Sequence, residues 1–220
     1  MKSFALFSGG KDSFLSITIA QEQGFDVDLC ITILPHEDSM MFQYPNVENS
    51  EFAASLLGLK TAYEQEERFE KIFKECGGAG YKACVAGAVA SEFQKTRIER
   101  LCTEAGIVLF SPLWRKSQFS ILNELLRRGI HAVIVSASAE GLTEEDLGHE
   151  IDEEYIQRLR NLWEKHGVNP TGEGGEFESF VTSYEVTGRK IEIGSNRKKW
   201  TGSSGYLVLE RLRILTLRGT

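Results

Sequence analysis

The segment from Ser8 to Ser13 constrains the fold of this chain more than any other six residues. It reads Ser-Gly-Gly-Lys-Asp-Ser and directly follows the short apolar run at residues 4–7. This pattern predicts a strand that ends at a glycine turn, with a helix that begins near Asp12. Two consecutive glycines allow positive φ and let a ligand approach the backbone closely. Because the first N–H groups of a helix have no partner within it, we expect the turn to bind a phosphate or pyrophosphate.

The side chains of this turn suit the same ligand. Lys11 supplies a positive charge, and the hydroxyl groups of Ser8 and Ser13 can donate hydrogen bonds. A glycine pair between a strand and a helix also occurs in proteins without any ligand, so a purely structural turn is the alternative. The spacing excludes the P-loop of nucleoside triphosphatases, which needs four residues between its glycines, and the dinucleotide pattern G-x-G-x-x-G is absent.

Strand-like apolar runs alternate with helical patterns over the first 140 residues. The expected strands are 3–7, 27–34, 61–63, 83–86, 108–111 and 132–135, and the expected helices are 13–23, 48–57, 66–76, 91–105 and 117–128. This alternation predicts an α/β fold, a parallel sheet with helices on both faces. Ligands of such sheets bind beyond the carboxyl ends of the strands, where residues 8–13, 87–91, 111–115 and 136–138 are expected to lie.

The pattern changes after about residue 140. A helix is expected at 152–166, followed by a segment rich in glycine and glutamate at 172–178 and by several short strand patterns. These strands read as antiparallel. We therefore expect two units: residues 1–140, which would bind the phosphate, and residues 141–220, a smaller α+β unit on the side of a second substrate.

Composition narrows the class of protein. The net charge is −7 and no long run of lysine and arginine exists, which argues against a protein that grips a nucleic-acid backbone. No apolar stretch approaches the roughly 18 residues needed to span a bilayer, and no signal-peptide pattern is present at the N-terminus. The four cysteines form no C-x-x-C pair, so we expect buried free thiols and a cytoplasmic protein.

Further candidate residues lie at the expected strand ends. Gly87 would allow close backbone approach, and Ser91, Gln94 and Arg97 recur at a three-residue spacing that places them on one helix face. An arginine there could hold the α-phosphate or the departing pyrophosphate, with a solvated helix face as the equally weighted alternative. Arg115 follows another strand end and is a candidate for binding a phosphate or a carboxylate.

The second informative segment is acidic. Glu173, Glu176 and Glu178 fall within six residues, among three glycines and next to Phe177 and Phe180. Carboxylates flanked by aromatic rings can hold an organic cation, and carboxylates alone can hold Mg²⁺. The alternative, given even weight, is a glycine-rich surface loop with solvated acids.

These motifs together resemble a known family. The turn at 8–13 resembles the PP-loop of the ATP pyrophosphatases, which cleave ATP to AMP and pyrophosphate. Combined with Gly87-Ala88-x-Ala90-Ser91, Ser111-Pro112-Leu113-Trp114, Leu147-Gly148 and Glu173-Gly174-Gly175-Glu176-Phe177-Glu178, the chain is similar to the diphthine–ammonia ligase family over nearly its whole length.

The resemblance implies a Rossmannoid fold like that of the adenine-nucleotide α-hydrolases, plus a smaller C-terminal domain. It also implies a reaction in which ATP adenylates the carboxylate of diphthine on translation elongation factor 2, and ammonia then forms the amide. ATP and Mg²⁺ would be required, and neither a membrane nor a nucleic acid would be a partner. The oligomeric state is left open, and a homodimer is compatible with the sequence.

Roles for individual residues follow from the resemblance and the chemistry together. Ser8, Gly9, Gly10, Asp12 and Ser13 are expected to cradle the pyrophosphate, with Lys11, Asp12 and Ser13 acting in the reaction and Asp12 placing Mg²⁺. The backbone of Thr32 and Ile33 is expected beside the adenine. Asn46 and Arg115 are candidates for binding the second substrate. We expect Glu173, Glu176 and Glu178 to surround the trimethylammonium group of diphthine.

Two departures from the family pattern concern the acceptor. Gln43 and Tyr44 stand where the family usually has His-Thr, although Asn46 is kept, and His149 replaces the arginine of Leu-Gly-Arg. A related enzyme with the same ATP chemistry but a different carboxylate or a tRNA as acceptor is therefore an alternative. A non-catalytic module that binds adenine nucleotides is another.

Overall fold

The first half of the molecule is a parallel sheet covered by helices. The computed structural model describes residues 1–35 and 46–216, and the segment 41–45 that includes Gln43 and Tyr44 lies outside them. Its strands are β1 (Lys2–Leu6), β2 (Asp26–Leu34), β3 (Lys60–Gln65), β4 (Ala83–Val85) and β5 (Val108–Phe110), in the spatial order β3-β2-β1-β4-β5. Every neighbouring pair is parallel, which confirms the predicted α/β class.

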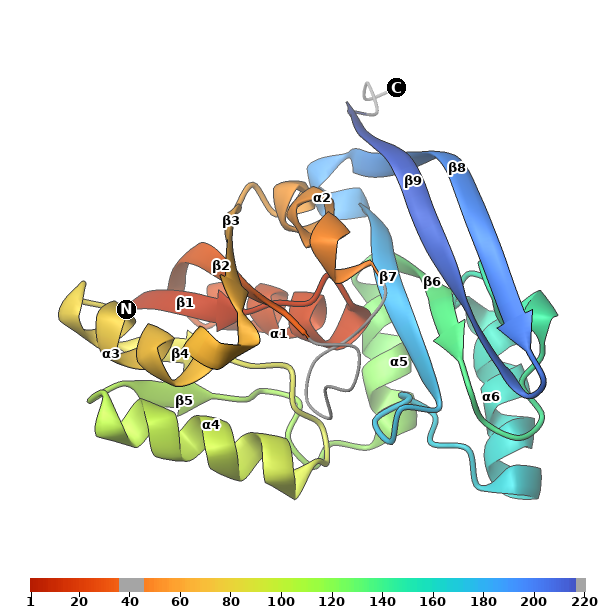
Figure 1. The fold of residues 1–220 in the computed structure, drawn as a ribbon, viewed down its shortest axis with the longest axis horizontal. Helices are drawn as coiled ribbons and strands as arrows, with labels where there is room; N and C mark the ends of the chain where they lie inside the picture. The colour runs from red at the N-terminus through yellow and green to blue at the C-terminus, as the bar shows by residue number, and fades with distance from the viewer. Residues whose placement is uncertain (36–45, 217–220) are drawn as a thin grey trace.

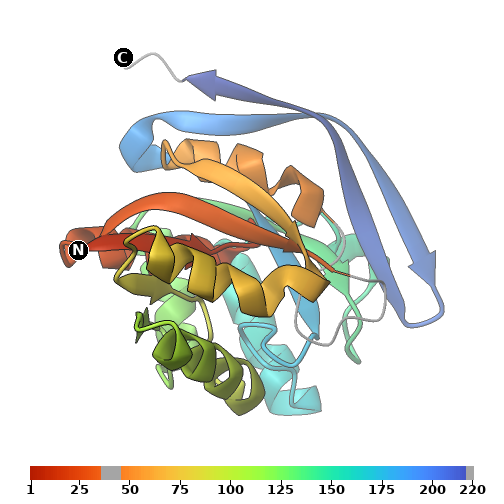
Figure 2. The ribbon, with the colours of Figure 1, turned by 60° about the vertical axis from the view of Figure 1, so that its left-hand side comes forward.

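Helices cover both faces of this sheet (Figures 1 and 2). They are α1 (Lys11–Glu22) and α2 (Ser50–Leu56) on one face, and α3 (Phe69–Gly78) and α4 (Glu92–Glu104) on the other. Under α3 and α4 the core is aromatic: the Phe4 and Phe73 rings meet edge to face with centroids 5.9 Å apart. Because β1 is almost entirely buried between the two helical layers, the residue that follows it is held at the centre of the sheet edge.

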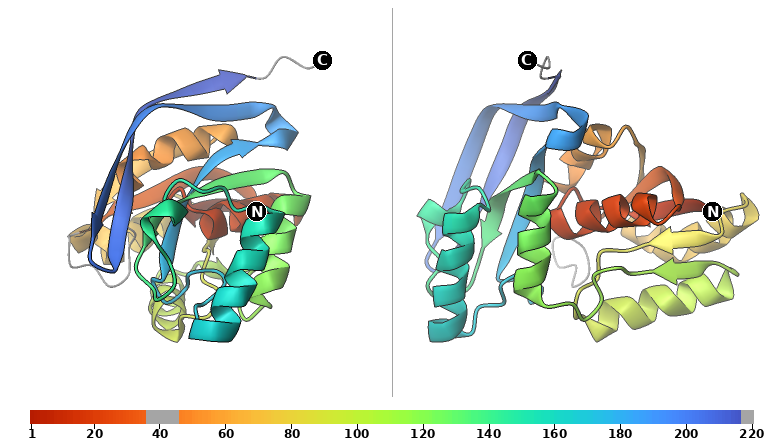
Figure 3. Two further views of the ribbon diagram at one scale, coloured as in Figure 1. Left: turned by 90° about the vertical axis from the view of Figure 1, so that its right-hand side faces the viewer. Right: turned by 180° about the vertical axis from the view of Figure 1, so that it is seen from behind.

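The second half is an antiparallel sheet that closes on itself. It contains β6 (Ile130–Ala137), β7 (Phe177–Tyr184), β8 (Arg189–Thr201) and β9 (Ser204–Thr216). Helices α5 (Gln118–Arg127) and α6 (Glu153–His166) accompany it, as seen from behind in Figure 3. Short 3₁₀ turns at Val47–Asn49, Glu66–Arg68, Glu144–Asp146 and Glu185–Thr187 complete the elements of the described residues.

One expected strand belongs to a different sheet from the one predicted. The strand expected at 132–135 is β6, which pairs antiparallel with β7 and β9 instead of extending the parallel sheet. The expected unit 1–140 therefore contains a strand of the second sheet. Strand β6 pairs this way because α5 turns the chain away from the parallel sheet and packs beside β6.

The two sheets share one hydrophobic core. Its buried side chains come from α1 and α2 of the first half and from α5, α6 and strands β6, β7 and β9 of the second. Phe14 on α1 meets Tyr184 at the end of β7 edge to face, with ring centroids 5.4 Å apart. All four cysteines are buried free thiols, as the sequence predicts. Among the described residues, the helices are too short or too polar to cross a membrane.

Candidate functional site

A cavity of about 400 Å³ lies where the two halves meet. It opens at the carboxyl ends of β1, β2 and β4, and the glycine-rich segment 171–175 forms its opposite wall. Its lining from the first half comprises Leu6, Phe7, Ser8, Lys11, Asp12, Ser13, Ile31, Ile33, Val47, Ala86, Gly87, Ala88, Ser91, Gln94 and Ile98. The volume falls within the range of small-molecule sites, and the position is the one expected for ligands of parallel sheets.

The turn at 8–13 is held in shape by its own hydroxyl groups. Gly10 N donates to Ser8 Oγ at 3.3 Å, Ser13 Oγ donates to Gly10 O at 3.0 Å, and the two hydroxyl oxygens lie 3.3 Å apart. Gly9 has φ +82°, and a Cβ there would lie 3.0 Å from the Phe180 ring. The glycine is therefore required by close contact with β7 behind the turn, while the serines face the cavity.

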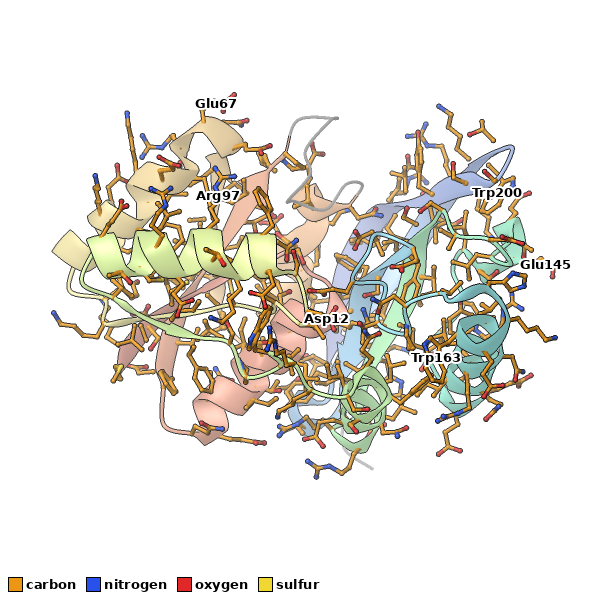
Figure 4. All side chains as sticks on the ribbon, turned by 90° about the horizontal axis from the view of Figure 1, so that it is seen from below. Asp12, Glu67, Arg97, Glu145, Trp163 and Trp200 are labelled. Atoms are coloured by element: carbon orange, nitrogen blue, oxygen red, sulfur yellow. The ribbon has the colours of Figure 1, made fainter. Side chains whose placement is uncertain are left out.

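Lys11 and Asp12 form the charged floor of the cavity, and Figure 4 shows Asp12 between the two halves. Lys11 Nζ donates to Asp12 Oδ2 at 2.9 Å and to Thr171 O at 2.5 Å. Asp12 Oδ1 is buried and has no hydrogen-bond partner among the described residues. Burial raises the pKa of Asp12, Lys11 lowers it in part, and the nearby Glu173 raises it again. A buried carboxylate oxygen without a donor suits a hard divalent cation.

Next to the turn at 8–13, the turn between β4 and α4 forms another part of the wall from the first half. A Cβ at Gly87 would lie 2.7 Å from Ser13 N and 2.9 Å from Asp12 C. The absence of a side chain at this position therefore lets the turn approach the first residues of α1, whereas the sequence suggested close approach to a ligand. Ser91 lines the cavity as expected, and its hydroxyl caps α4 by accepting from Gln94 N.

The two arginines predicted for the site lie outside the cavity. On α4 the face toward the cavity carries Gln94 and Ile98, so Arg97 lies to one side, with its guanidinium over the Phe69 ring at 5.1 Å. Figure 4 shows Arg97 remote from Asp12. Arg115 is mostly exposed and pairs with Glu92. Neither side chain is in the lining. On α4 the cavity face continues from Gln94 to Ile98, one residue beyond Arg97. Arg115 lies outside the helices, between β5 and α5.

Two other predicted residues form side-chain hydrogen bonds inside the protein, and the contact expected of the Thr32 backbone stays a prediction. The Thr32 side chain is fully buried and donates to Phe7 O at 2.8 Å, while its neighbour Ile33 lines the cavity as expected. The Asn46 amide is occupied at both ends, because Nδ2 donates to Leu207 O at 2.7 Å and Oδ1 accepts from Leu209 N at 2.8 Å. Asn46 thus ties the first half to β9, and each polar atom of its amide already has a backbone partner.

The acidic segment separates into three different roles. Glu173 Oε1 accepts from the backbone N–H groups of residues 89–91, and Glu176 accepts from Gly174 N at 2.8 Å and Asn169 N at 3.2 Å within its own loop. Glu173 and Glu178 line the cavity, whereas Glu176 does not. Phe177 and Phe180 are about 1% exposed and belong to the core, so the aromatic walls expected from them are not formed.

Sequence reasoning did not find the backbone groups of the site. The Thr171 carbonyl that accepts from Lys11 and the N–H groups of residues 89–91 have no signature in the side-chain pattern. The sequence also did not predict that carboxylates outnumber basic side chains in the cavity lining. Among the described lining residues, Lys11 is the one lysine or arginine, against the carboxylates of Asp12, Glu173 and Glu178. A triphosphate would add negative charge to this lining, and a cation bound with it would offset the repulsion.

Two family models match most of the chain. The model of the diphthamide synthase N-terminal domain matches residues 1–109, and that of the diphthamide synthase C-terminal domain matches residues 117–215. A diphthine–ammonia ligase of Danio rerio is 27% identical over 88% of this chain and 86% of its own length. That of Homo sapiens is 25% identical over 99% and 92%.

Coverage differs among the relatives. The diphthine–ammonia ligase of Schizosaccharomyces pombe is 28% identical, and the match covers 88% of this chain but 36% of the yeast protein. The chain therefore spans about a third of that relative. A solved structure of a predicted subunit of tRNA methyltransferase from Methanocaldococcus jannaschii aligns with 84% of this chain and 97% of its own, with TM-score 0.47 and 17% identity.

Proposed function

The chain belongs to the diphthamide synthase family, and on this premise we propose that it is an ATP-dependent ligase that converts diphthine on translation elongation factor 2 to diphthamide. The observation that carries the proposal is the state of Asp12. Its Oδ1 is buried without a partner, beside Lys11, in the turn that lines a cavity at the carboxyl ends of parallel strands. A phosphate-binding turn with an open carboxylate suits a metal-bound nucleotide.

The proposed reaction has two steps. An oxygen of the diphthine carboxylate attacks the α-phosphorus of ATP, the bond from that phosphorus to the bridging oxygen breaks, and pyrophosphate leaves with the electron pair. Ammonia then attacks the carbonyl carbon of the acyl-adenylate, loses a proton, and expels AMP. Charge builds up on the departing pyrophosphate, so donors placed around it accelerate the first step.

The residues of the turn supply those donors. We assign the pyrophosphate to the cavity face of Ser8 and Ser13, whose hydroxyl groups are about 3.3 Å apart, with the Lys11 ammonium beside them. Asp12 would hold Mg²⁺ through Oδ1, the oxygen without a hydrogen-bond partner. The ion would supply the positive charge that the carboxylate-rich lining lacks. Ile31 and Ile33 give the cavity an apolar side that suits the adenine ring.

The acceptor side of the proposal rests on Glu178. This residue lies at the start of β7 and lines the cavity. We propose that Glu178 attracts the trimethylammonium group of diphthine, because charge attraction needs no hydrogen-bond donor on the ligand. A cytoplasmic location follows from a substrate that works in translation.

The test is pyrophosphate release from ATP with purified elongation factor 2 that carries diphthine, in the presence of ammonium. We expect release that depends on this acceptor, and a Lys11→Ala protein about 100-fold slower. Ser8→Ala, a smaller change, should also slow release, because it removes a hydroxyl that lines the cavity and accepts from Gly10 N within the turn. If pyrophosphate were released with another carboxylate or with tRNA, but not with diphthine on elongation factor 2, that other molecule would be the acceptor. Tight AMP binding without turnover would instead make the chain a nucleotide sensor.

The pH profile offers a second readout of Asp12. Burial first, and then Glu173, raise the pKa of this carboxyl above its usual value, and a protonated carboxyl binds no cation. Pyrophosphate release should therefore fall as the pH drops through that raised pKa. Lys11 lowers the pKa of Asp12, so Lys11→Ala should move this acidic limb to higher pH. If the acidic limb of the Lys11→Ala profile did not move, Asp12 would not be the group that binds the proposed metal.

A further inference from the structure

Glu173 makes the most concentrated contact between the two halves. One carboxylate oxygen, Oε1, accepts from Val89 N at 3.0 Å, Ala90 N at 2.8 Å and Ser91 N at 3.0 Å. The three donors are consecutive N–H groups of the turn between β4 and α4. Hydrogen bonds between backbone N–H groups and an ionised acceptor are shorter and stronger than those between neutral groups. A single side chain of the second half thus holds the whole turn.

This contact spans the cavity from one wall to the other. Glu173 belongs to the wall at 171–175, and the turn at 87–91 belongs to the wall from the first half. A second charged contact lies two residues away, where Lys11 Nζ donates to Thr171 O at 2.5 Å. Two contacts therefore set the distance between the walls. One joins Lys11 in the turn at 8–13 to Thr171, and the other joins the start of α4 to Glu173.

The backbone around Glu173 is shaped for this contact. Gly172 has φ +74°, a conformation that glycine adopts without strain, and a Cβ there would lie 2.4 Å from Phe177 O. The chain consequently turns tightly against the start of β7 and directs Glu173 toward the first half. Because the hydrophobic core also runs through both halves, the tie is not what keeps them together, and its loss would act on the cavity alone.

We propose that Glu173 is a positioning residue that sets the width of the nucleotide cavity, and not a group that binds the acceptor. The proposal rests on the proposed use of ATP. The carboxylate holds the 89–91 turn against segment 171–175, so that Asp12, Ser13 and Ser91 face a ligand of fixed size.

The experiment compares Mg²⁺-ATP binding by calorimetry in the full-length protein and in its Glu173→Ala and Glu173→Gln variants. Alanine removes the acceptor oxygen, and we expect the Kd for ATP to rise at least about tenfold. Glutamine keeps a carbonyl oxygen at the same place, so its Kd should stay within about threefold of the parent. The melting temperature of Glu173→Gln should stay within about 2 °C of the parent. That of Glu173→Ala should fall by no more than about 8 °C, because hydrogen bonds are lost while the shared core is untouched.

Glu176→Ala is the matched control. It removes a carboxylate that also accepts from backbone N–H groups of this loop but does not reach 89–91, and it should leave the Kd for ATP within about twofold. An equal loss in this variant would overturn the proposal, because loosening of the loop alone would then explain both effects.

Other results would contradict the proposal in recognisable ways. Tighter ATP binding by Glu173→Ala would show that the carboxylate occupies a phosphate position and must be displaced. Unchanged ATP binding with a raised KM for the acceptor, in the alanine and glutamine variants alike, would restore Glu173 to substrate recognition. If the parent protein itself bound no ATP, the proposed function would fail instead.

Discussion

At the scale of single residues, Gly87 shows how tightly the site is built. It follows β4, and the nearest backbone atoms to a Cβ at this position would be Ser13 N at 2.7 Å and Asp12 C at 2.9 Å. These atoms belong to the first turn of α1, which cannot move without carrying Asp12 with it. A side chain at residue 87 would therefore push against Asp12 and Ser13 and disturb the turn at 8–13.

We predict that Gly87→Ala lowers the free energy of unfolding by about 1–3 kcal/mol and slows pyrophosphate release, because backbone atoms cannot swing aside as a side chain would. Denaturant titration and the release assay measure the two effects. Gly78→Ala is the matched control, since nothing lies within 4 Å of a Cβ at that helical position. A Gly87→Ala protein with the stability and rate of the parent would refute the argument.

Residue-level prediction succeeded where the chain itself fixes the geometry. A glycine turn after a buried strand placed Ser8, Lys11, Asp12 and Ser13 in the cavity lining, because the start of α1 has one orientation relative to β1. It did not extend to partners far along the chain. Asn46 meets β9 across more than 160 residues, and nothing in the local sequence announces that contact.

At the scale of elements, the helices and strands were predictable, but the partner of a strand was not. The sequence predicted β6 near residues 132–135 as one more parallel strand, yet its partners are β7 and β9. A half-buried strand has the same apolar pattern in either sheet. The direction of the chain as it leaves α5 decides which strands β6 can pair with. That direction depends on how α5 packs against β6 and α6, which follow it in the sequence.

His131 joins three elements of the second half. Its Nδ1 lies 2.6 Å from Glu150 Oε1 and its Nε2 lies 3.0 Å from Glu185 Oε1, which connects β6 to the segment before α6 and to the turn after β7. Burial favours the neutral ring, but the two carboxylates outweigh it and raise the pKa of His131 above its usual value. The protonated ring is therefore more stable in the folded chain than in the unfolded one.

This raised pKa predicts a pH dependence of stability. The contribution of His131 is complete below the unfolded pKa of about 6.5 and is lost as the pH rises through the folded pKa. Because the ring is a third exposed, we expect about 1 kcal/mol or less. Urea titrations between pH 5.5 and 8.5 should show the parent losing more stability than His131→Gln over this range. If the free energy of unfolding changed with pH in the same way in both proteins, the contacts of His131 with Glu150 and Glu185 would not contribute to stability.

At the scale of the whole molecule, the two halves are not independent bodies. The matched domain models divide the chain between residues 109 and 117, but the hydrophobic core does not divide there. Buried side chains of α1 and α2 belong to the same cluster as those of α6 and β7, and Val181 N donates to Gly9 O at 2.9 Å. The turn at 8–13 is thus completed by a strand from the second half.

A shared core predicts that the chain unfolds in one cooperative transition. Calorimetry should give a single peak with equal calorimetric and van't Hoff enthalpies. Leu159 on α6 is fully buried in this core, so Leu159→Ala, at a cost of about 2–5 kcal/mol, should shift the whole transition to lower temperature. If only the second half melted earlier, two transitions would appear. The cavity would then lie between separable domains, and ATP binding would depend on their docking rather than on a common fold.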